Sequence, residues 1–417
     1  MTIQRIKGTQ DLLDTGLYRE LVNRLEKFFV RHNFGYIKTP ILEPLDLFER
    51  TLGEHTDVVG KEMFVIQQRE GSSETICLRP EATASTVRAF IENGIQSTPW
   101  KVFSLGSMFR YENPQKGRLR EFTQCNIEII GGESIAYDIY SMWLLNTLFT
   151  DTFLLDNYAL QINFLGCSSD RIKFREQLFN FLTVHEQDLC QLCAQRKNKN
   201  ILRVFDCKNT GCQKLYTKAP KITEYLCAVC AVEWDHVQKG LSALSVSYSV
   251  RPTLVRGLDY YDKTVFEFVS TELGAQSTFC GGGRYSKLVS ELGGSRDYSS
   301  VGCAFGLERV LLLLESKKDL LIPAEAPLVV IIPCTSEQHV LGLLVADMVR
   351  QDAPQVALEI ILDGSVKSML RKADKLGARY ALLIGSDEQA AQTITIKNLM
   401  TGTQEQVPVV ELISKLV

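Results

Sequence analysis

Residues 100–130, WKVFSLGSMFRYENPQKGRLREFTQCNIEII, contain two long strand-like segments on either side of a polar loop. The segments are 100–110 and 121–130, and the loop between them contains Pro114 and Gly117. Two strands joined by a loop of this kind pair in antiparallel fashion. The stretch therefore predicts a β-hairpin within an antiparallel sheet.

The segments around this hairpin have helical or strand-like patterns. Apolar residues recur at helical spacing in 17–34 and 135–155, and the segment 302–309 is expected to be a strand, a glycine at 306 and then a further helix. Strands are expected at 36–42, 63–67, 75–78, 245–250, 264–270 and 277–280. These elements predict an α+β domain, an antiparallel sheet with flanking helices, over residues 1–168 and 245–320.

Two further regions differ from this domain in character. Residues 169–244 are rich in lysine, glutamine and cysteine and lack strand alternation, which predicts a helical, Cys-rich insertion. The polar stretch 317–326 contains Pro323 and predicts a linker. Residues 326–417 follow a β-α-β-α-β order, which is typical of a small α/β domain with a partly parallel sheet. Its expected elements are strands 328–332, 358–362 and 380–384, and helices 337–349 and 366–376.

The composition excludes several classes of protein. Of the 417 residues, 45% are hydrophobic and 23% are charged, as in folded rather than disordered chains. The net charge of −3 provides no overall attraction for nucleic acid, so such binding requires local patches. The sequence has neither an apolar run of membrane-spanning length nor an apolar signal segment near its start. We therefore expect a cytoplasmic, multidomain protein with no membrane partner.

The hairpin carries residues that suit a phosphate ligand. Arg110 ends the first strand, and its planar guanidinium can pair with two phosphate oxygens. The loop adds three cations, Lys116, Arg118 and Arg120. Alternation along the returning strand places three polar residues on one face, Gln124, Asn126 and Glu128. A solvated hairpin is the alternative, but it leaves this repeated set of hydrogen-bonding groups unexplained.

Four other segments gather residues that suit a charged ligand. They are LRPEAT at 78–83, LVRGLDYY at 254–261, GGGRY at 281–285 and GCAFGLER at 302–309. Their glycines permit a close approach of backbone to a ligand. Each segment alone also has a purely structural explanation, such as a surface ion pair or, for the glutamate of LRPEAT, an interaction with a helix dipole.

Taken together, these segments resemble the histidyl-tRNA synthetases, which are class II aminoacyl-tRNA synthetases. FRYE and GRLREFTQ in the hairpin are similar to class II motif 2, GCAFGLER is similar to motif 3, and 35–44 is similar to motif 1. LVRGLDYY and GGGRY are similar to the two histidine-specific signatures of the family. Ser286 and Asn113 depart from the usual pattern but leave the motif arginines unchanged.

The resemblance covers nearly the whole chain and implies an architecture and an activity. It implies a class II catalytic domain, a helical insertion and a C-terminal anticodon-binding domain. The implied enzyme is a histidine–tRNA ligase. The carboxylate of L-histidine attacks the α-phosphorus of ATP, pyrophosphate leaves, and the histidyl group passes to the 3′ end of tRNA(His). Magnesium would bridge the phosphates, and two chains would form a homodimer through motif 1.

The resemblance also implies roles for residues that contact ATP and tRNA. Arg110 would hold the α-phosphate and Arg309 the γ-phosphate, and Arg256 would neutralise charge that develops at the α-phosphorus. Glu112 would belong to the ATP site. Two residues of the motif 2 loop would contact the acceptor end of the tRNA, Gln115 and Arg120.

The histidine site implied by the resemblance draws on three segments. Its members are Glu81, Ala82, Thr83, Gln124, Glu128, Tyr260 and Tyr261. Glu81, Thr83 and Gln124 would hold the ammonium group. Glu128 and one of the two tyrosines would hydrogen-bond the imidazole. Such a polar pocket rejects analogues that leave its groups unpaired, so no editing domain is required.

The C-terminal domain contains a candidate contact surface for the anticodon stem. Lys367, Arg371 and Lys375 follow one another at a spacing of four, which places them on one face of the expected helix. A solvated helix face is the alternative explanation. The domain as a whole is slightly acidic, so an RNA contact depends on this local strip.

The insertion contains six of the twelve cysteines. Two Cys-x2-Cys pairs, Cys190 with Cys193 and Cys227 with Cys230, have the spacing that is usual for a tetrahedral zinc site. They predict a possible structural zinc ion. The alternative is a set of reduced cysteines without metal, because the family does not need zinc. The cysteines outside the insertion are expected to be packing residues.

Two rival functions have to be weighed against the ligase. One is a synthetase-like regulatory subunit of histidine biosynthesis that binds histidine and does not charge tRNA. Such proteins typically lack the LVRGLDYY signature and the C-terminal domain, and both are present here. The other rival is a class II synthetase for another amino acid, which the two histidine-specific segments disfavour.

Overall fold

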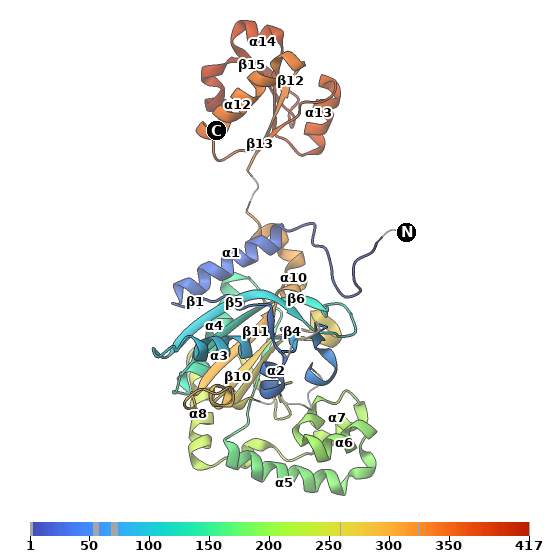
Figure 1. Cartoon of the computed structure of the whole chain (residues 1–417), viewed down its shortest axis with the longest axis vertical. Helices are drawn as coiled ribbons and strands as arrows, with labels where there is room; N and C mark the ends of the chain where they lie inside the picture. Colours follow the sequence, from blue (N-terminus) through green and yellow to red (C-terminus); the bar gives the residue numbers. More distant parts are fainter. Residues whose placement is uncertain (1–2, 53–57, 68–73, 259, 324–325, 417) are drawn as a thin grey trace. The chain divides into compact units, whose positions relative to one another are not determined.

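The computed structural model describes residues 3–52, 58–67, 74–258, 260–323 and 326–416. The chain folds into two units, Met1–Ile322 and Pro323–Val417 (Figure 1). In the described part of the chain, no helix combines the length and apolar character that a membrane crossing requires.

An eight-stranded, mainly antiparallel sheet forms the centre of the first unit. Its order is β1 (Gly35–Tyr36), β5 (Trp100–Phe109), β6 (Glu121–Ile130), β11 (Ser300–Gly306), β10 (Thr278–Tyr285), β9 (Asp262–Val269), β7 (Ala159–Phe164) and β8 (Tyr248–Val250). The strands from β5 to β7 pair in antiparallel fashion, whereas the outermost pairs, β1 with β5 and β7 with β8, are parallel. The hairpin of β5 and β6 has the position and direction that the sequence predicts.

One face of this sheet carries an apolar core. It is covered by α1 (Gly16–Arg31), α4 (Ala136–Thr147) with the following π-helical turn η2 (Leu148–Thr152), α8 (Ala228–Ala243) and α10 (Leu307–Leu314). The ring of Phe149 in η2 lies at the middle of this core, 5.0–5.5 Å from the rings of Phe268, Phe279 and Phe305. Cys125, Ile127 and Ile129 of β6 face the same core. The alternate residues of β6 therefore face the opposite side of the sheet.

That opposite side is covered by smaller elements. They are α2 (Leu45–Leu52), the π-helical turn η1 (Val58–Glu62), α3 (Thr83–Glu92), α9 (Leu288–Glu291) and a small sheet of β2 (Leu42–Pro44), β4 (Ile76–Leu78) and β3 (Phe64–Val65). The 3-10 turn η6 (Thr271–Gln276) joins β9 to β10. Val87 and Phe90 of α3 pack against Ile130 and Tyr285 of the large sheet. The first turn of α3 thereby comes close to the polar residues of β6.

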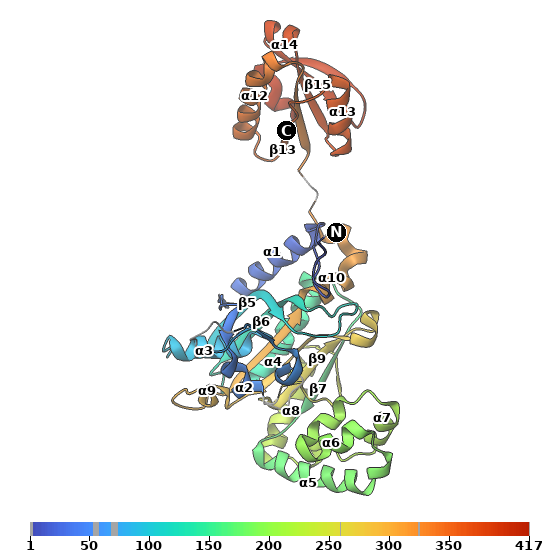
Figure 2. The same ribbon diagram turned by 45° about the vertical axis from the view of Figure 1, so that its right-hand side comes forward.

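The helical segment inserted between β7 and β8 has a core of its own. It comprises α5 (Ser168–Val184), α6 (Gln191–Lys199), α7 (Thr210–Tyr216), α8 and the 3-10 turns η3 (Glu186–Asp188), η4 (Ile201–Asp206) and η5 (Ile222–Glu224). Figures 1 and 2 show α5, α6 and α7 grouped at the end of the unit that lies away from α1. Phe174 and Leu178 of α5 share a core with Leu254 and Val265, so the segment packs against the loop that precedes β9.

The second unit is a five-stranded mixed sheet with helices on both faces. Its strand order is β13 (Ala357–Ile360), β12 (Leu328–Pro333), β14 (Tyr380–Ile384), β15 (Thr393–Asn398) and β16 (Gln404–Pro408). Its helices are α12 (His339–Asp352), α13 (Val366–Lys375), α14 (Ser386–Ala391) and α15 (Leu412–Leu416), with the 3-10 turns η8 (Ser336–Gln338) and η9 (Val409–Glu411). Alternate residues of β12 face α12 and α13, which lie on opposite sides of the sheet (Figure 2).

Several details differ from the sequence-based expectations. The strand expected at 36–42 is wrong at its centre, because the Thr39 and Pro40 carbonyls accept hydrogen bonds from the Arg79 guanidinium and proline has no N–H for a ladder. The linker expected from 317 is also wrong at its start. The turn η7 (Glu315–Lys317) and the helix α11 (Lys318–Leu321) continue the first unit, with Leu321 buried in its core. Three strands were not expected at all, β7, β15 and β16.

Candidate active site

A cavity lies on the polar face of the large sheet. Its walls come from the β5–β6 hairpin, from the start of α3, from the loop before β9 and from the ends of β10 and β11. Nine predicted site residues line it: Glu81, Thr83, Arg110, Glu112, Gln124, Arg256, Tyr260, Tyr261 and Arg309. Gly281 of the GGGRY segment also lines the cavity, so five separate segments of the sequence converge on it.

Arg110 follows the last residue of β5 and lies in the wall of the cavity. Its Nε donates to the Pro80 carbonyl at 2.9 Å, and its guanidinium lies 5.4 Å from the centre of the Phe122 ring. Burial lowers the pKa of Arg110 below its ordinary value. Among the described residues, no carboxylate forms an ion pair with this guanidinium. Arg110 is therefore a half-buried cation with capacity for an anionic ligand.

Arg309 reaches the same cavity from the first turn of α10. Its Nε donates to the Gly117 carbonyl at 2.8 Å, and its Nη1 donates to the Thr278 carbonyl. Burial lowers the pKa of Arg309, and the neighbouring cations Arg118 and Arg110 lower it further. Three guanidinium groups that line one partly enclosed space, those of Arg110, Arg118 and Arg309, favour a ligand with several negative charges.

Arg256 lies in the loop before β9 and is paired with a carboxylate. Its Nη1 forms an ion pair with Glu267 of β9, while its Nε is buried without a partner among the described residues. Burial lowers the pKa of Arg256, but the Glu267 carboxylate outweighs this effect, so the pKa lies above its ordinary value. A Cβ atom at Gly281 would lie 2.5 Å from the Arg256 Nη1. The glycine therefore leaves the space that the guanidinium occupies.

Glu81 and Thr83 form the polar edge of the cavity beside α3. The two carboxylate oxygens of Glu81 accept the backbone N–H groups of Thr83 and Ala84 at 2.7 and 2.8 Å. These bonds satisfy free N–H groups at the start of the helix. Burial raises the pKa of Glu81. Ala82 is fully buried between the two polar residues and is not part of the cavity wall.

Glu128 lies behind this edge rather than in the cavity wall. Its carboxyl group accepts hydrogen bonds from the Thr83 and Tyr285 hydroxyl groups, each at 2.7 Å. Gly302, on the neighbouring strand, leaves room for this carboxyl group. Burial raises the pKa of Glu128 to about 8. A protonated Glu128 could therefore act as both donor and acceptor near neutral pH.

Two polar groups of β6 have no hydrogen-bond partner within the described structure. They are the Oε1 atom of Gln124 and the Nδ2 atom of Asn126, and both residues line the cavity. Buried polar groups without partners are rare because each costs free energy. An acceptor and a donor side by side on the cavity floor are suited to a polar ligand.

Tyr260 and Tyr261 form the aromatic wall of the cavity. Their ring centres are 4.5 Å apart, and Tyr260 also packs edge-on against Tyr285 at 5.7 Å. Burial raises the pKa of Tyr260, and it raises that of Tyr261 to about 12. Both phenols are therefore neutral hydrogen-bonding groups at neutral pH. Asp259 of the same segment lies outside the described residues.

Comparisons with known proteins agree with this geometry. The family model of histidyl-tRNA synthetase matches residues 8–310, and an anticodon-binding domain model matches residues 328–417. The chain belongs to the histidyl-tRNA synthetase family. It is 41% identical to the histidine–tRNA ligase of Solidesulfovibrio magneticus, with 97% of this chain and 95% of the relative aligned. It is 39% identical to the histidine–tRNA ligase of Aquifex aeolicus, with 99% of this chain and 100% of the relative aligned.

A solved structure supports the same assignment for the fold. The apo histidyl-tRNA synthetase of S. aureus matches with a TM-score of 0.80 and 28% identity, covering 100% of both chains. The α+β fold with an antiparallel class II sheet and a C-terminal α/β anticodon-binding domain is therefore confirmed. The individual residue roles implied by the family remain proposals.

The motif 2 loop of the protein has an internal ion pair. Glu112 is buried and pairs with Arg118, so one predicted ATP-site residue is already engaged by a loop cation. The Arg120 guanidinium stacks on the Tyr111 ring at 3.8 Å, and its Nε donates to the Glu112 carbonyl at 3.2 Å. Gln115 is exposed near the tip of the loop. The loop therefore has an ordered base and an accessible tip.

The predicted tRNA strip lies in the second unit. Lys367, Arg371 and Lys375 are all exposed on α13, whereas Met369 and Ala373 on its other side are buried against the sheet. The structure therefore leaves these three cations accessible to solvent.

The two Cys-x2-Cys pairs of the insertion do not come together. Cys190 and Cys193 lie in a cluster with Cys207 and Cys212, whereas Cys227 and Cys230 lie in a second cluster with Cys167 and Asp170. The prediction placed both pairs in one site, and it treated Cys167 as a packing residue. Sequence spacing does not determine which pairs meet, because the helices between them set the path of the chain.

Three residues of the site were missed from the sequence. Glu267 pairs with Arg256, Tyr285 bonds to Glu128, and Glu308 lines the cavity beside Arg309. The signal for Glu267 is an acidic residue within the otherwise apolar strand TVFEFV. The Oε2 atom of Glu308 is buried without a partner in the described part of the chain, and its Oε1 accepts the Thr123 N–H at 2.7 Å. A free carboxylate oxygen of this kind fits a magnesium ligand.

Proposed function

We propose that the protein is a histidine–tRNA ligase that activates L-histidine with ATP and transfers it to tRNA(His). The observation that carries the proposal is the convergence of Arg110, Arg256 and Arg309 with the Glu81–Thr83 edge on one cavity. Full-length relatives named histidine–tRNA ligase support it. The activity belongs to the cytoplasm, where aminoacyl-tRNA is consumed in translation.

In the first step, a carboxylate oxygen of histidine bonds to the α-phosphorus of ATP and the bond to the pyrophosphate oxygen breaks. Arg110 holds the α-phosphate, and Arg309 holds the γ-phosphate. Arg256, which is positioned by Glu267, stabilises the charge that develops at the α-phosphorus. Positioning and electrostatic stabilisation account for most of the rate enhancement in such displacements.

Magnesium, bound together with ATP, offsets phosphate charge. Glu308 would supply a carboxylate ligand, and the phosphates would supply the others. Glu112 supports the ATP site by holding Arg118 in the loop above it. The residues present therefore fit the ion that the reaction requires.

The histidine substrate lies between the Glu81–Thr83 edge and the two tyrosines. Glu81, Thr83 and Gln124 bind the ammonium group, and Ala82 shapes the edge from behind. A tyrosine hydroxyl and Glu128 recognise the imidazole, the latter from its position behind Thr83. The raised pKa of Glu128 supports this role, because a group that is protonated near neutral pH can adapt to either imidazole nitrogen.

Replacing Glu128 by Gln tests its protonation state in the free protein. Because burial raises the pKa of Glu128 from 4.5 to about 8, the folded state retains a proton that the unfolded state loses. The stability of the wild type therefore falls as the pH rises from 4.5 towards 8. Glu128→Gln lacks this titration, so its Tm relative to the wild type should increase between pH 6 and 8. Thermal unfolding followed by tryptophan fluorescence measures the Tm of both proteins. A Tm difference that stays constant between pH 6 and 8 would contradict the raised pKa of Glu128.

In the second step, the 3′-terminal ribose hydroxyl of tRNA attacks the histidyl carbonyl and AMP leaves. Gln115 and Arg120 of the motif 2 loop would contact the acceptor end. Lys367, Arg371 and Lys375 would contact phosphates of the anticodon stem, in the unit that matches the anticodon-binding domain model.

Replacing Lys367, Arg371 and Lys375 together by Ala should weaken tRNA binding alone. The KM for tRNA(His) should rise about tenfold or more, and the salt dependence of binding should fall by about one unit per lost contact. Histidine-dependent pyrophosphate exchange should be unchanged. Arg350→Ala is the matched control, because Arg350 is an exposed cation on α12. A triple variant with wild-type charging kinetics would contradict the role of the strip.

A homodimer through residues 35–44 is the proposed assembly. β1 lies at the edge of the sheet, and Tyr36, Ile41 and Leu42 are each at least 44% exposed. An exposed edge strand with apolar neighbours is suited to association. Light scattering on the full chain should give twice the mass of the monomer. The double variant Tyr36→Glu with Leu42→Glu should give the mass of a single chain.

The test of the whole function is ATP–pyrophosphate exchange with each of the twenty amino acids, followed by charging of tRNA(His). Exchange with histidine alone and transfer to tRNA are the expected results. A folded protein that binds histidine without exchange would instead be a regulatory subunit of histidine biosynthesis. Exchange with a different amino acid would contradict the role of the Glu128 and tyrosine pocket.

A further inference from the structure

Four cysteines of the inserted helical segment converge from two separate stretches of the chain. Cys190 and Cys193 flank the start of α6, and Cys207 and Cys212 lie between η4 and the first turn of α7. All four sulfur atoms lie within 4.8 Å of one another. The cluster is distinct from the active site, since none of the four residues lines that cavity.

The spacing of the sulfur atoms fits a single metal ion. The Cys190 and Cys207 Sγ atoms are 3.7 Å apart. Four sulfurs placed about 2.3 Å from a central ion in tetrahedral geometry are separated by about 3.8 Å. A disulfide bond would require a separation of about 2.05 Å. An iron–sulfur cluster separates its cysteine sulfurs farther than a single ion does. The spacing of the sulfur atoms therefore fits one metal ion rather than a disulfide bond or an iron–sulfur cluster.

Backbone N–H groups are directed at the sulfur atoms. The Asn209 N–H donates to the Cys207 Sγ at 3.4 Å, and the Cys190 N–H donates to the Cys212 Sγ at 3.3 Å. Donors of this kind stabilise thiolate ligands more than neutral thiols. The Asn209 side chain also accepts the N–H of Cys212 at 3.2 Å and so fixes the start of α7. Ligand positions on both stretches are thus set by hydrogen bonds around them.

The local fold depends on these cysteines. The only buried residues of α6 are Cys193 and Lys197, and the only buried residues of α7 are Cys212 and Tyr216. Helices of nine and seven residues are not stable without tertiary anchoring. Each helix therefore has a cysteine as one of its two points of attachment. A metal ion would join both helices at those points and supply the stabilisation that a small hydrophobic core lacks.

We propose that Cys190, Cys193, Cys207 and Cys212 bind one structural Zn²⁺ ion. Four thiolates in tetrahedral coordination are the donor set that zinc takes in structural sites, and three of the four cysteines here are buried. The ion fixes η4, α6 and α7 to one another. This site is independent of the ligase activity and goes beyond it.

The second cluster of possible ligands provides the comparison. Cys167, Cys227 and Cys230 lie around Asp170, whose two carboxylate oxygens accept the Cys167 and Cys227 N–H groups at 3.2 and 2.9 Å. These bonds cap α5 and connect it to α8, so they explain the burial of Asp170 without a metal. A variant of this cluster is therefore the matched control for a variant of the first.

The experiment is metal analysis of the full-length protein, purified with added Zn²⁺ and then dialysed against a weak chelator. About one zinc ion per chain is expected in the wild type. Cys190→Ser should lose most of it and Cys230→Ser should keep it. Cys190 is the best position for the change, because it is only half-buried and serine is a preferred helix N-cap residue. The Cys190→Ser protein is expected to remain folded.

A measurement on the wild type makes the test independent of any variant. Replacement of the metal by Co²⁺ gives an intense visible spectrum with a thiolate charge-transfer band when four thiolates surround the ion tetrahedrally. That spectrum is the expected result. A wild type without bound metal, iron in place of zinc, or zinc that disappears in Cys230→Ser and persists in Cys190→Ser would overturn the proposal.

Discussion

Arg256→Ala is expected to lower histidine-dependent ATP–pyrophosphate exchange by about 10²- to 10³-fold, the usual effect of removing one preorganised group that stabilises transition-state charge. Its guanidinium lies in the cavity wall, paired with Glu267, and its Nε has no partner among the described residues. The loss should fall mainly on kcat, since the charge develops during the reaction. Exchange kinetics with saturating histidine measure it. A wild-type kcat in the variant would contradict a catalytic role for Arg256.

Two comparisons separate this effect from general damage. Arg251→Ala removes an exposed arginine five positions earlier, whose contact is with Gln161, and should leave the exchange unchanged. Gly281→Ala keeps Arg256 but adds a methyl group where its guanidinium lies, 2.5 Å from Nη1. This variant should therefore lose exchange as well. Gly60→Ala is its control, because a Cβ there meets no atom within 4 Å in the described structure.

Arg284→Met is expected to destabilise the first unit by about 3–5 kcal/mol, because it leaves a buried carboxylate without its partner. The side chains of Arg284 and Asp138 are 1% and 0% exposed, and the guanidinium also donates to the Gly132 and Ser134 carbonyls at 2.9 and 2.8 Å. The Arg284 side chain thus joins β10 to α4 and to the loop that follows β6 in the interior of the unit. The change should lower the midpoint of urea unfolding strongly.

Tryptophan fluorescence reports this transition for the first unit alone, since Trp100, Trp143 and Trp234 all lie within it. The double variant Arg284→Met with Asp138→Leu should be less destabilised than Arg284→Met, because no uncompensated charge remains. If the single variant unfolds at the wild-type midpoint, or the double variant is the less stable of the two, the buried pair does not have this role.

Arg256 and Arg284 show where inference from sequence stops. Both belong to histidine-specific segments and both stand beside glycine, so their local patterns suggest equal importance. Their partners decide the difference. Glu267 holds Arg256 at the cavity, whereas Asp138, 146 positions away, holds Arg284 in the interior. A partner as distant in the chain as Asp138 leaves no mark in a local pattern.

The hairpin shows the opposite case. Alternation of Gln124, Cys125, Asn126, Ile127 and Glu128 determines which side chains face the core and which face the opposite side of the sheet, because the period of a strand is two. The position of β5 and β6 followed directly from the sequence. The alternation places Glu128 on the correct face but not at the correct depth. Thr83, from a helix 45 residues earlier, lies between it and the cavity.

The strands that were missed have a common physical reason. β7 lies between two helical stretches and pairs with β8 only after the whole inserted segment has been traversed. β15 and β16 form a hairpin that follows a β-α-β pattern and reverses its direction. In both cases the pairing partner, rather than the propensity of the segment, makes it a strand.

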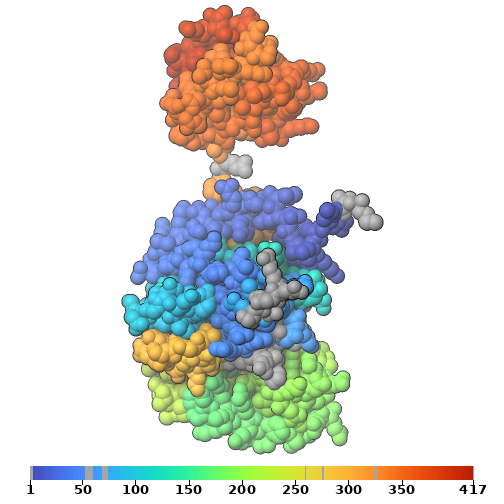
Figure 3. Space-filling view, in the orientation of Figure 1, coloured from blue at the N-terminus to red at the C-terminus, as the bar shows by residue number. Residues whose placement is uncertain are grey.

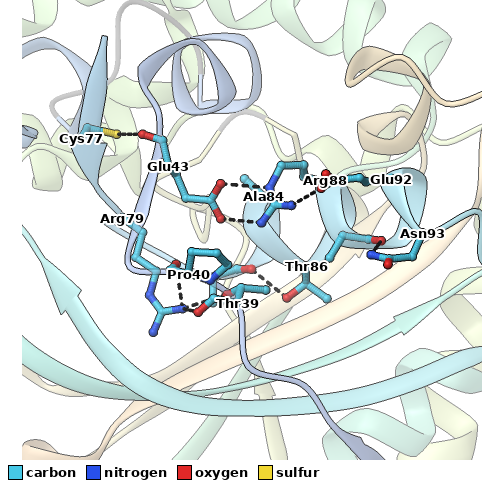
Figure 4. Close-up of polar contacts among 12 residues, drawn as sticks. Thr39, Pro40, Glu43, Cys77, Arg79, Ala84, Thr86, Arg88, Glu92 and Asn93 are labelled. Carbon is cyan, nitrogen blue, oxygen red and sulfur yellow. Dashed lines mark hydrogen bonds and ion pairs between the residues drawn. The ribbon is translucent and has the colours of Figure 1, made fainter. Parts of the chain in front are cut away.

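One arginine outside the cavity has a mechanical consequence for the whole site. The buried Arg79 donates to the Thr39 and Pro40 carbonyls in the segment after β1 (Figure 4). Its Nε also donates to the Ser107 carbonyl of β5. Close by, Glu43 and Arg88 tie the same segment to α3 by an ion pair at 2.8 Å. The surface of this part of the first unit is seen in Figure 3. These contacts join the edge of the sheet to the helix that begins at the Glu81–Thr83 edge of the cavity. A displacement of the sheet edge is therefore expected to shift that side of the cavity as well.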